Sequence, residues 1–555
     1  MAAHTGRDDG GREDAARLAA NHPGTRRNGQ IVVVARVAPR SLRESLRPGL
    51  LAGLASALAL LAVLLPARLL LGVPHLAELA SDWLTLVIPL GLFDAALGLL
   101  GRAARPLLFA SALALLLLLG ALPGLWQAQR GWRLRGGLGL GLLTWLVVGL
   151  VLLPVFQVGP FGQHLSVGAG RTALALALAC LVQGLTLGLL TPLLTGPTVA
   201  PGGAIAPARP ARRRFLVGSA AALLGLALAA WLGRRNRDTE AQDSLPRDEN
   251  GVMLGAQRSP GTLAPLITPN TAFYVVSKNP LEDPDLPPEV WSLRVTGLVE
   301  HPLELSYPEL LAMPWVEQDQ TLECISNEVG GELISTARWR GVPVRDVLAR
   351  AGAAGWAVKL EVICDDRYST GLPWGIAQAP DTLLAYAMNG APLPREHGGP
   401  VRLLVPGRYG MKSAKWVVGL QPTQDNYLGY WELRGWTDDA TVKTMARIDT
   451  PAPGARVGPG PVRVAGIAYA GRRGIKLVEC SADGGITWQP ARLIEPALSP
   501  LTWVRWEAEF TPTSAARTVL QVRATDGQGI PQVTRSIPPL PYGAAGIHTV
   551  VVLNM

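Results

Sequence analysis

The segment TLECISN at residues 321–327 places one cysteine, Cys324, among apolar and short polar residues. A second segment, HGGPVRLLVPGRYGMKSAKW at residues 397–416, brings one histidine, two arginines and two lysines together. A lone cysteine beside apolar residues is most often a small buried hydrophobe, and a basic segment is often a solvated loop. The apolar run VRLLVPG argues against a solvated loop, because a charge in such a setting needs a partner.

Three further motifs accompany these two segments: TPNTAFY at 268–274, RWRGVP at 338–343 and LLAYAMNG at 383–390. In order and approximate spacing, all five resemble the sulfite oxidase family of molybdenum enzymes. The resemblance covers residues 260–555 and implies an oxidoreductase with a molybdenum-molybdopterin cofactor. It makes Cys324 the metal ligand and catalytic residue, since thiolate is a soft, electron-donating ligand.

The pterin of such a cofactor ends in a phosphate monoester. Binding this group in a cleft calls for arginine forks, lysine charges, hydroxyls and backbone N–H groups. The resemblance implies that the basic segment supplies them. The expected contacts, with Lys412 added as a further candidate, are His397, Arg402, Ser413, Ala414 and Lys415.

The segment TPNTAFY resembles the part of the family pattern that touches the pterin through polar and aromatic groups. It implies contacts from Asn270, Phe273 and Tyr274. A turn started by the asparagine before a strand is the alternative interpretation. A hydrogen bond to the pterin ring is expected from Asp366, with its neighbour Asp365 as the alternative.

The sequence departs from the family pattern at the substrate. Val276 and Val329 stand where sulfite oxidases carry anion-binding arginines, and Trp436 aligns with their active-site tyrosine. A sulfite dianion needs cationic donors. We therefore expect a small substrate that is either sulfite or, in preference because of the lost arginines, a less charged sulfoxide, N-oxide or other oxyanion.

Charge is unevenly distributed along the 555 residues. Residues 1–235 hold 22 arginines, no lysine and 8 acidic residues, although the whole chain carries a net charge of only +9. The positive charge lies beside apolar runs, which is typical of a membrane protein with positive loops inside. The pattern argues against nucleic acid as a partner.

Six apolar runs, at 49–73, 83–101, 106–127, 137–157, 171–194 and 214–232, approach the roughly 20 residues that cross a bilayer. The run 83–101 contains Pro89 and Asp94 and is expected to lie at the interface. With about five spans, the arginine clusters at 130–135 and 212–214 face the cytoplasm. The predicted parts are a cytoplasmic tail (1–48) and a transmembrane region (49–235).

The last predicted span follows ARRRFL at residues 211–216, which resembles a twin-arginine export signal. An ordinary stop-transfer cluster is the alternative. A cofactor inserted in the cytoplasm requires folding there, and the twin-arginine route carries folded domains. We therefore expect a multi-pass protein of the cytoplasmic membrane, with its catalytic domain on the extracytoplasmic side.

Beyond a linker at 236–267, the pattern of apolar and polar residues changes twice. Residues 268–440 mix short β-branched runs with short helical stretches, which predicts an α+β molybdopterin-binding domain. Residues 441–555 alternate apolar and polar residues between Asp-Gly and Gly-Gly turns, which predicts an Ig-like β-sandwich. This part resembles the family's dimerisation domain and implies a homodimer through 441–555.

The sequence leaves the electron route open. His75 and His164 lie at predicted span ends or loops, so no haem is expected in this chain, and a separate electron-transfer protein or a quinone is expected as partner. Two other classes of function are a non-catalytic scaffold with the same fold and a transporter built on residues 49–232. The spans carry few charges away from their ends, where a transport pathway would place them.

Overall fold

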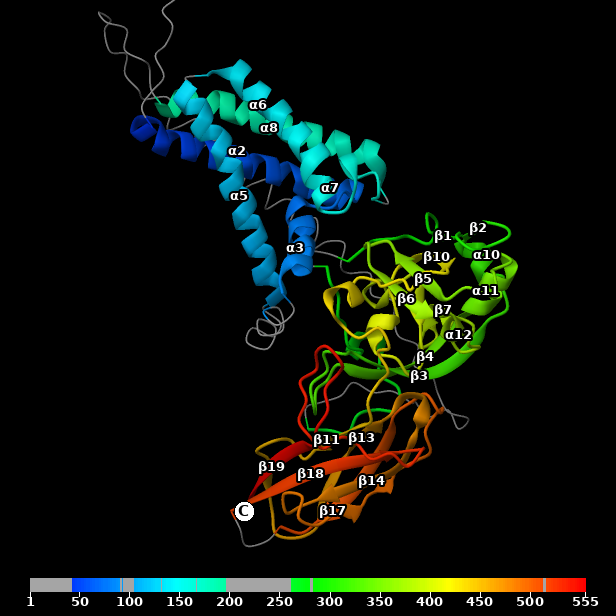
Figure 1. Ribbon diagram of the computed structural model, residues 1–555. Helices are drawn as coiled ribbons and strands as arrows, with labels where there is room; N and C mark the ends of the chain where they lie inside the picture. Colours follow the sequence, from blue (N-terminus) through cyan, green and yellow to red (C-terminus); the bar gives the residue numbers. More distant parts are fainter. Residues whose placement is uncertain are drawn as a thin grey trace, which may run out of the picture. The chain divides into compact units, whose positions relative to one another are not determined.

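The computed structural model describes residues 42–89, 92, 104–130, 132–165, 167–195, 261–279, 283–512 and 516–555. Helices occupy the N-terminal part and β-sheets the C-terminal part (Figure 1). The tail at 1–41, the twin-arginine-like motif at 212–216, the apolar run at 214–232 and most of the predicted linker lie outside the described residues.

The N-terminal part forms long apolar helices joined by short segments. Its helices are α2 (Leu42–Leu71), α3 (Leu76–Val87), α5 (Ala104–Arg130), α6 (Leu134–Val147), α7 (Leu153–Val155) and α8 (Gly168–Thr195), with η2 (Val148–Leu152) and η3 (Pro160–Gly162). Among the described residues, four helices are long and apolar enough to cross a membrane: Leu46–Leu71, Leu107–Arg130, Leu134–Val155 and Gly168–Thr195. They coincide with four of the predicted spans.

A shorter helix, α3, lies at the start of the predicted run 83–101, most of which is outside the described residues. Helix α3 has only 12 residues, begins with a capping box at His75 and Glu78, and ends before Ile88. A helix of this length covers about 18 Å at 1.5 Å per residue, less than the roughly 30 Å of a hydrocarbon core. Helix α3 contains only residues 83–87 of the predicted run, so the prediction that the run 83–101 does not span stays a prediction.

Two compact units share the described residues. One takes α6 and the adjoining parts of α2, α5 and α8, and the other takes α3 and all the β-sheets. In the first unit, a Cβ on Gly53 would lie 2.2 Å from the carbonyl oxygen of Ala121. The backbones of α2 and α5 therefore approach too closely for any other residue, as small residues permit between helices in membranes.

Two sheets precede residue 440. The first has the order β2-β1-β10-β5-β6, and the second has the order β3-β4-β7-β8 with β9 paired to β7. Their strands are β1 (Ser292–Val295), β2 (Leu303–Ser306), β3 (Val316–Glu323), β4 (Ile334–Pro343), β5 (Lys359–Cys364), β6 (Ser369–Pro373), β7 (Leu383–Met388), β8 (Ala391–Pro392), β9 (Arg402–Leu404) and β10 (Val417–Thr423).

Short helices connect these strands: η4 (Asn270–Ala272), α10 (Tyr307–Leu311), α11 (Val344–Arg350), α12 (Trp374–Ala377), η5 (Arg395–His397), η6 (Gly410–Lys412) and η7 (Glu432–Arg434). A shared core of buried aliphatic and aromatic residues joins both sheets and their helices. The mixture of strands and short helices confirms the predicted α+β character of this part.

Two further sheets follow, with orders β11-β13-β17-β16 and β12-β19-β18-β14-β15. Strand β18 alternates between buried and less buried positions along its length, and both sheets contribute to one apolar core, as facing sheets of a sandwich do. The strands are β11 (Met445–Thr450), β12 (Arg456–Val457), β13 (Val462–Tyr469), β14 (Ile475–Ser481), β15 (Gln489–Pro490), β16 (Arg492–Leu493), β17 (Val504–Phe510), β18 (Arg517–Asp526) and β19 (His548–Asn554), with η8 (Gly471–Arg473) after β13.

Candidate cofactor site

A cavity of about 110 Å³ lies where β3 ends and β9 begins, and Cys324 is in its wall. We call it the Cys324 cavity. Most residues predicted to bind the cofactor line it, although they come from positions up to 142 residues apart. The predicted residues in its lining are Phe273, Tyr274, Cys324, Asp366, Arg402, Ser413, Ala414 and Lys415.

The turn after β3 fixes Cys324 in the wall. The backbone N–H of Cys324 donates to Leu333 O at 2.9 Å, and that of Asn327 donates to Cys324 O at 2.9 Å. The side chain of Asn327 accepts from Leu333 N at 2.9 Å and donates to Glu323 Oε1 at 3.1 Å. The asparagine of TLECISN thus ties both sides of the loop that presents the thiol.

Glu323 is a buried carboxyl next to Cys324 that sequence reasoning missed. Burial raises its pKa to about 7, although the hydrogen bond from Asn327 and the charge of Arg447 act in the opposite direction. Its Oε2 atom is buried without a hydrogen-bond partner among the described residues. Burial thus favours the protonated form of a carboxyl group beside the predicted metal ligand.

Arg402 is a buried cation in the lining without a carboxylate within ion-pair distance in the described part of the chain. Two of its nitrogens donate to His397 O and Ser413 O, both at 2.9 Å, whereas its buried Nε has no hydrogen-bond partner among the described residues. Burial lowers its pKa to about 10. A desolvated guanidinium in the lining of a cavity suits an anion, because an unpaired buried charge is costly.

Lys415 adds a second cation to the same side. Its Nζ donates to Glu396 O at 2.6 Å, and burial, reinforced by the charge of Arg402, lowers its pKa to about 8. Ser413 accepts a hydrogen bond from Val405 N at 3.1 Å. The stretch 413–415 therefore lies against β9, where its groups converge with Arg402.

Asn270 and His397, both predicted contacts, lie behind the lining. His397 Nε2 donates to Asn270 O at 2.7 Å, and burial lowers the pKa of His397 to about 4, so the imidazole is neutral at pH 7. The Asn270 side chain donates to Met388 O at 3.2 Å and accepts from Asn389 at 2.9 Å. Both side chains therefore lie behind the cavity wall, where they hydrogen-bond to other groups of the protein.

The segment after η4 lines the cavity with five of its residues: Phe273, Tyr274, Val276, Ser277 and Lys278. Phe273 stacks on Tyr274 at 5.4 Å and meets the edge of Trp339 at 5.6 Å. Because consecutive residues line the cavity, a two-residue period would not have identified Lys278, which sequence reasoning missed.

Asp366 lies in the lining, whereas Asp365 does not. Its carboxylate accepts from Tyr368 N at 3.0 Å and lies 3.7 Å from Lys278 Nζ. The geometry favours Asp366 over its neighbour. Besides Val276 and Lys278, the lining residues outside the predicted set are Ser277, Leu322, Ile325, Ser326, Tyr368, Gly410, Met411, Trp416, Trp431 and Trp436.

Lys412 is placed differently from the prediction. It lies outside the cavity lining, and its Nζ donates to Glu432, to Gly371 O at 2.9 Å and to Asp438 Oδ1 at 3.1 Å. Its side chain is 2% exposed, and that of Glu432 is 1% exposed. The amine points away from Ser413 because two carboxylates elsewhere in the fold neutralise it.

Replacing Lys412 by methionine should therefore reduce stability. Removing one partner of a buried ion pair leaves the other charge uncompensated and costs about 3–5 kcal/mol of unfolding free energy. Denaturant titration of the purified protein measures this loss. Adding Glu432→Gln to Lys412→Met should recover part of it, and a Lys412→Met protein as stable as wild type would contradict the assignment.

Comparison with known proteins gives a family match for this part of the chain. Residues 280–431 match the family described as "Oxidoreductase molybdopterin binding domain". Sulfite oxidase from Gallus gallus is 32% identical over 309 residues, which cover 47% of this chain and 66% of that protein. The uncharacterized oxidoreductase YuiH of Bacillus subtilis is 38% identical over 146 residues, covering 26% of this chain and 72% of that protein.

Two further matches complete the comparison. Human mitochondrial sulfite oxidase is 34% identical over 302 residues, so the chain spans about half of that relative (55%). The structure of the sulfane dehydrogenase SoxCD from Paracoccus pantotrophus aligns at 27% identity with a TM-score of 0.46, over 52% of this chain and 80% of that chain.

The matched domain and the Cys324 cavity together define a molybdopterin-dependent oxidoreductase. The chain belongs to the sulfite oxidase family, and its cofactor is molybdenum-molybdopterin. The described residues fit this group: a thiol stands in the cavity wall, and Arg402, a buried cation with no carboxylate paired to it among them, lines the same cavity. An anionic cofactor would supply the counter-charge that Arg402 lacks.

Proposed function

We propose that this protein is a membrane-anchored oxidoreductase that transfers an oxygen atom to or from a small substrate. Cys324 would ligate molybdenum, while Arg402 and the stretch 413–415 would bind the pterin phosphate. The observation that carries the proposal is the convergence of these residues on one cavity. The cofactor, when bound, supplies the redox and oxygen-transfer chemistry.

The protein's own residues hold and orient this group. The Cys324 turn, tied by Asn327, fixes the thiolate donor. The cations Arg402 and Lys415 neutralise the phosphate in a water-poor wall, where charge-assisted hydrogen bonds are strong. Asp366 and Tyr274 are the lining groups proposed to hydrogen-bond the remainder of the cofactor.

Metal and pterin analysis of the purified full-length protein tests the proposal. We expect molybdenum and pterin in equal amounts, followed by dye-linked turnover of a sulfoxide or an N-oxide in preference to sulfite. A protein that carries neither molybdenum nor pterin after expression in a cofactor-producing host would overturn it.

The substrate preference is proposed from the apolar and aromatic part of the cavity. Val276, Trp431 and Trp436 line it, and the two indoles stack at 4.1 Å with an 8° interplanar angle. The Nε1 atom of Trp436 is buried without a hydrogen-bond partner in the described structure. A neutral substrate whose oxygen accepts one hydrogen bond suits such a wall better than a dianion.

Replacing Val276 by arginine should create sulfite oxidation. A charge-assisted hydrogen bond contributes about 1.5–3 kcal/mol, so kcat/KM for sulfite should rise by roughly 10- to 100-fold. Steady-state kinetics with sulfite and an N-oxide measure the change. Val329→Arg is the matched control, because Val329 lies beside Gly546 and outside the lining. An equal gain in both variants would contradict this substrate assignment.

The remaining parts are proposed from the sequence and the helices. We assign 49–235 as a membrane region of about five spans, including one behind the twin-arginine-like motif. Residues 268–440 would form the cofactor domain on the extracytoplasmic side of the cytoplasmic membrane. The Ig-like sandwich at 441–555 would mediate a homodimer, and a quinone or separate protein would exchange electrons with the cofactor. The four long apolar helices support the membrane assignment.

A further inference from the structure

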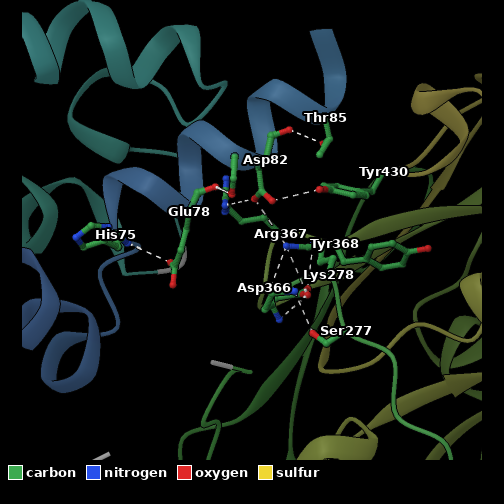
Figure 2. A network of polar contacts seen from close by, with 12 residues as sticks. His75, Glu78, Asp82, Thr85, Ser277, Lys278, Asp366, Arg367, Tyr368 and Tyr430 are labelled. Carbon is green, nitrogen blue, oxygen red and sulfur yellow. Dashed lines mark hydrogen bonds and ion pairs between the residues drawn. The ribbon is translucent and has the colours of Figure 1, made fainter. Parts of the chain in front are cut away.

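Helix α3 carries an acidic residue, Asp82, whose partners belong to the cofactor-binding part of the chain. Its Oδ2 lies 2.6 Å from an Arg367 nitrogen and 3.9 Å from Lys278 Nζ, and its Oδ1 accepts from the Tyr430 hydroxyl at 3.2 Å. Figure 2 shows Asp82 on α3 pointing toward Lys278, Arg367 and Tyr430. Arg367 and Tyr430 are 285 and 348 residues away in the sequence.

Arg434 strengthens the same contact. It donates to Asp82 O at 3.0 Å and to Thr85 Oγ1 at 2.8 Å. Its guanidinium lies 3.5 Å from the centre of the Tyr430 ring. Helix α3 is therefore attached to the segment around η7 by side-chain and backbone groups within one helical turn.

Lys278 connects this contact with the Cys324 cavity. Its side chain is 5% exposed, and its ammonium lies between two carboxylates, 3.9 Å from Asp82 and 3.7 Å from Asp366. Both Lys278 and Asp366 line the cavity, so a single side chain separates Asp82 from the site. Burial opposes both charges, yet the opposite charges prevail: they raise the pKa of Lys278 and lower that of Asp82.

Asp82 supplies a counter-charge to two cations of the cofactor-binding part, Lys278 and Arg367. Without it, Asp366 would be the remaining ion-pair partner of Lys278 among the described residues, and Arg367 would lose the carboxylate 2.6 Å from its guanidinium. Lys278 would then be buried with one counter-charge instead of two. Because Lys278 lines the cavity, this loss would destabilise the cavity wall. Groups that orient the residues around a metal or cofactor commonly govern its retention and electronic properties.

We propose that Asp82 is a positioning residue of the cofactor site and acts through Lys278. The helix that precedes the apolar segments at 92–130 thus completes a site built otherwise from residues beyond 260. This inference rests on the proposed function, because it takes the Cys324 cavity as the cofactor site. It adds that the N-terminal helical part of the chain is required for the correct cofactor environment.

The test compares Asp82→Asn with Thr85→Val in the full-length, cofactor-loaded protein. Both changes remove a bond between α3 and the same partner segment, but only Asp82 contacts a lining residue. We expect Asp82→Asn to lose molybdenum and pterin about tenfold faster on dialysis and to alter the molybdenum(V) paramagnetic resonance spectrum. Thr85→Val should leave both properties at wild-type values, and Asp82→Glu should restore much of the loss.

Equal behaviour of Asp82→Asn and Thr85→Val in both measurements would overturn the inference. If Asp82→Asn does not accumulate, Lys278→Gln with and without Asp82→Asn replaces it. Equal release rates in that pair support action through Lys278, and a tenfold faster release in the double variant contradicts it. Wild-type protein that contains molybdenum, together with an unaltered Asp82→Asn protein, would refute only this inference and leave the proposed function standing.

Discussion

Replacing Cys324 by serine should abolish most turnover while leaving the pterin bound. A hydroxyl is a harder and less electron-donating ligand than a thiolate. Groups that only support a metal ligand already cost 10- to 100-fold when removed, so loss of the ligand itself should cost at least about 100-fold in kcat. Sulfur-to-metal charge-transfer absorption and the molybdenum(V) spectrum should change at the same time.

Cys480→Ser is the matched control for this variant. Cys480 is also a buried cysteine, but it lies in β14 within the core of the second pair of sheets. It should lower stability without altering the metal spectrum or the turnover of folded protein. An unchanged spectrum in Cys324→Ser would remove the basis for assigning the thiolate to the metal.

The pterin should stay in Cys324→Ser because its proposed anchor is elsewhere. Arg402 and Lys415 belong to the segment around β9 and η6, whereas Cys324 belongs to the turn after β3. Metal ligation and phosphate binding are thus carried by different elements. Pterin analysis beside metal analysis separates the two contributions.

The sequence predicted the site best where backbone position alone decides it. Cys324 follows a buried strand, and the stretch 413–415 lies beside β9, so local order along the chain brings them to one wall. The sequence does not specify the direction in which a long side chain points. Lys412 is next to Ser413, yet its amine reaches Glu432 and Asp438, 20 and 26 residues further on.

A similar limit applies to polar residues that support a wall. Asn270 and His397 were predicted as contacts, but they bond to each other and to the backbone behind the lining. Motif spacing specifies that such residues are near the site and does not specify which atoms face it. Asp82 illustrates the extreme case, because no local pattern pairs an acidic residue in an apolar stretch with Arg367, 285 residues later.

The strands of the C-terminal sheets were predictable for a simpler reason. A strand with one buried face requires a period of two, and β18 shows this alternation over ten residues. The helical spans were likewise evident from length and composition. Contacts between elements depend on tertiary packing, which neither the strand period nor the length and composition of a helix specifies.

Arg402→Met should release the cofactor. Arg402 is 4% exposed, its Nε is unused, and within the described residues no carboxylate pairs with it. Removing one partner of a buried, hydrogen-bonded charge pair costs about 2–5 kcal/mol. Since about 1.4 kcal/mol corresponds to a factor of ten, pterin affinity should fall by roughly 30- to 3,000-fold. Pterin and molybdenum content after gel filtration at pH 7 measure the loss.

Arg338→Met is the control for this change, and Arg402→Lys refines it. Arg338 is paired with Asp319 at 2.8 Å and lies outside the cavity lining, so its loss should leave cofactor content unchanged. Lysine keeps the charge of Arg402 but lacks the planar fork that could bond His397 O, Ser413 O and an anion together, so cofactor retention should be intermediate. Full cofactor content in Arg402→Met would show that the phosphate is held elsewhere.

Raising the pH above 8 should weaken pterin binding in the wild-type protein. Burial lowers the pKa of Lys415 to about 8. Above that pH, phosphate binding must recover a proton that the free site has lost.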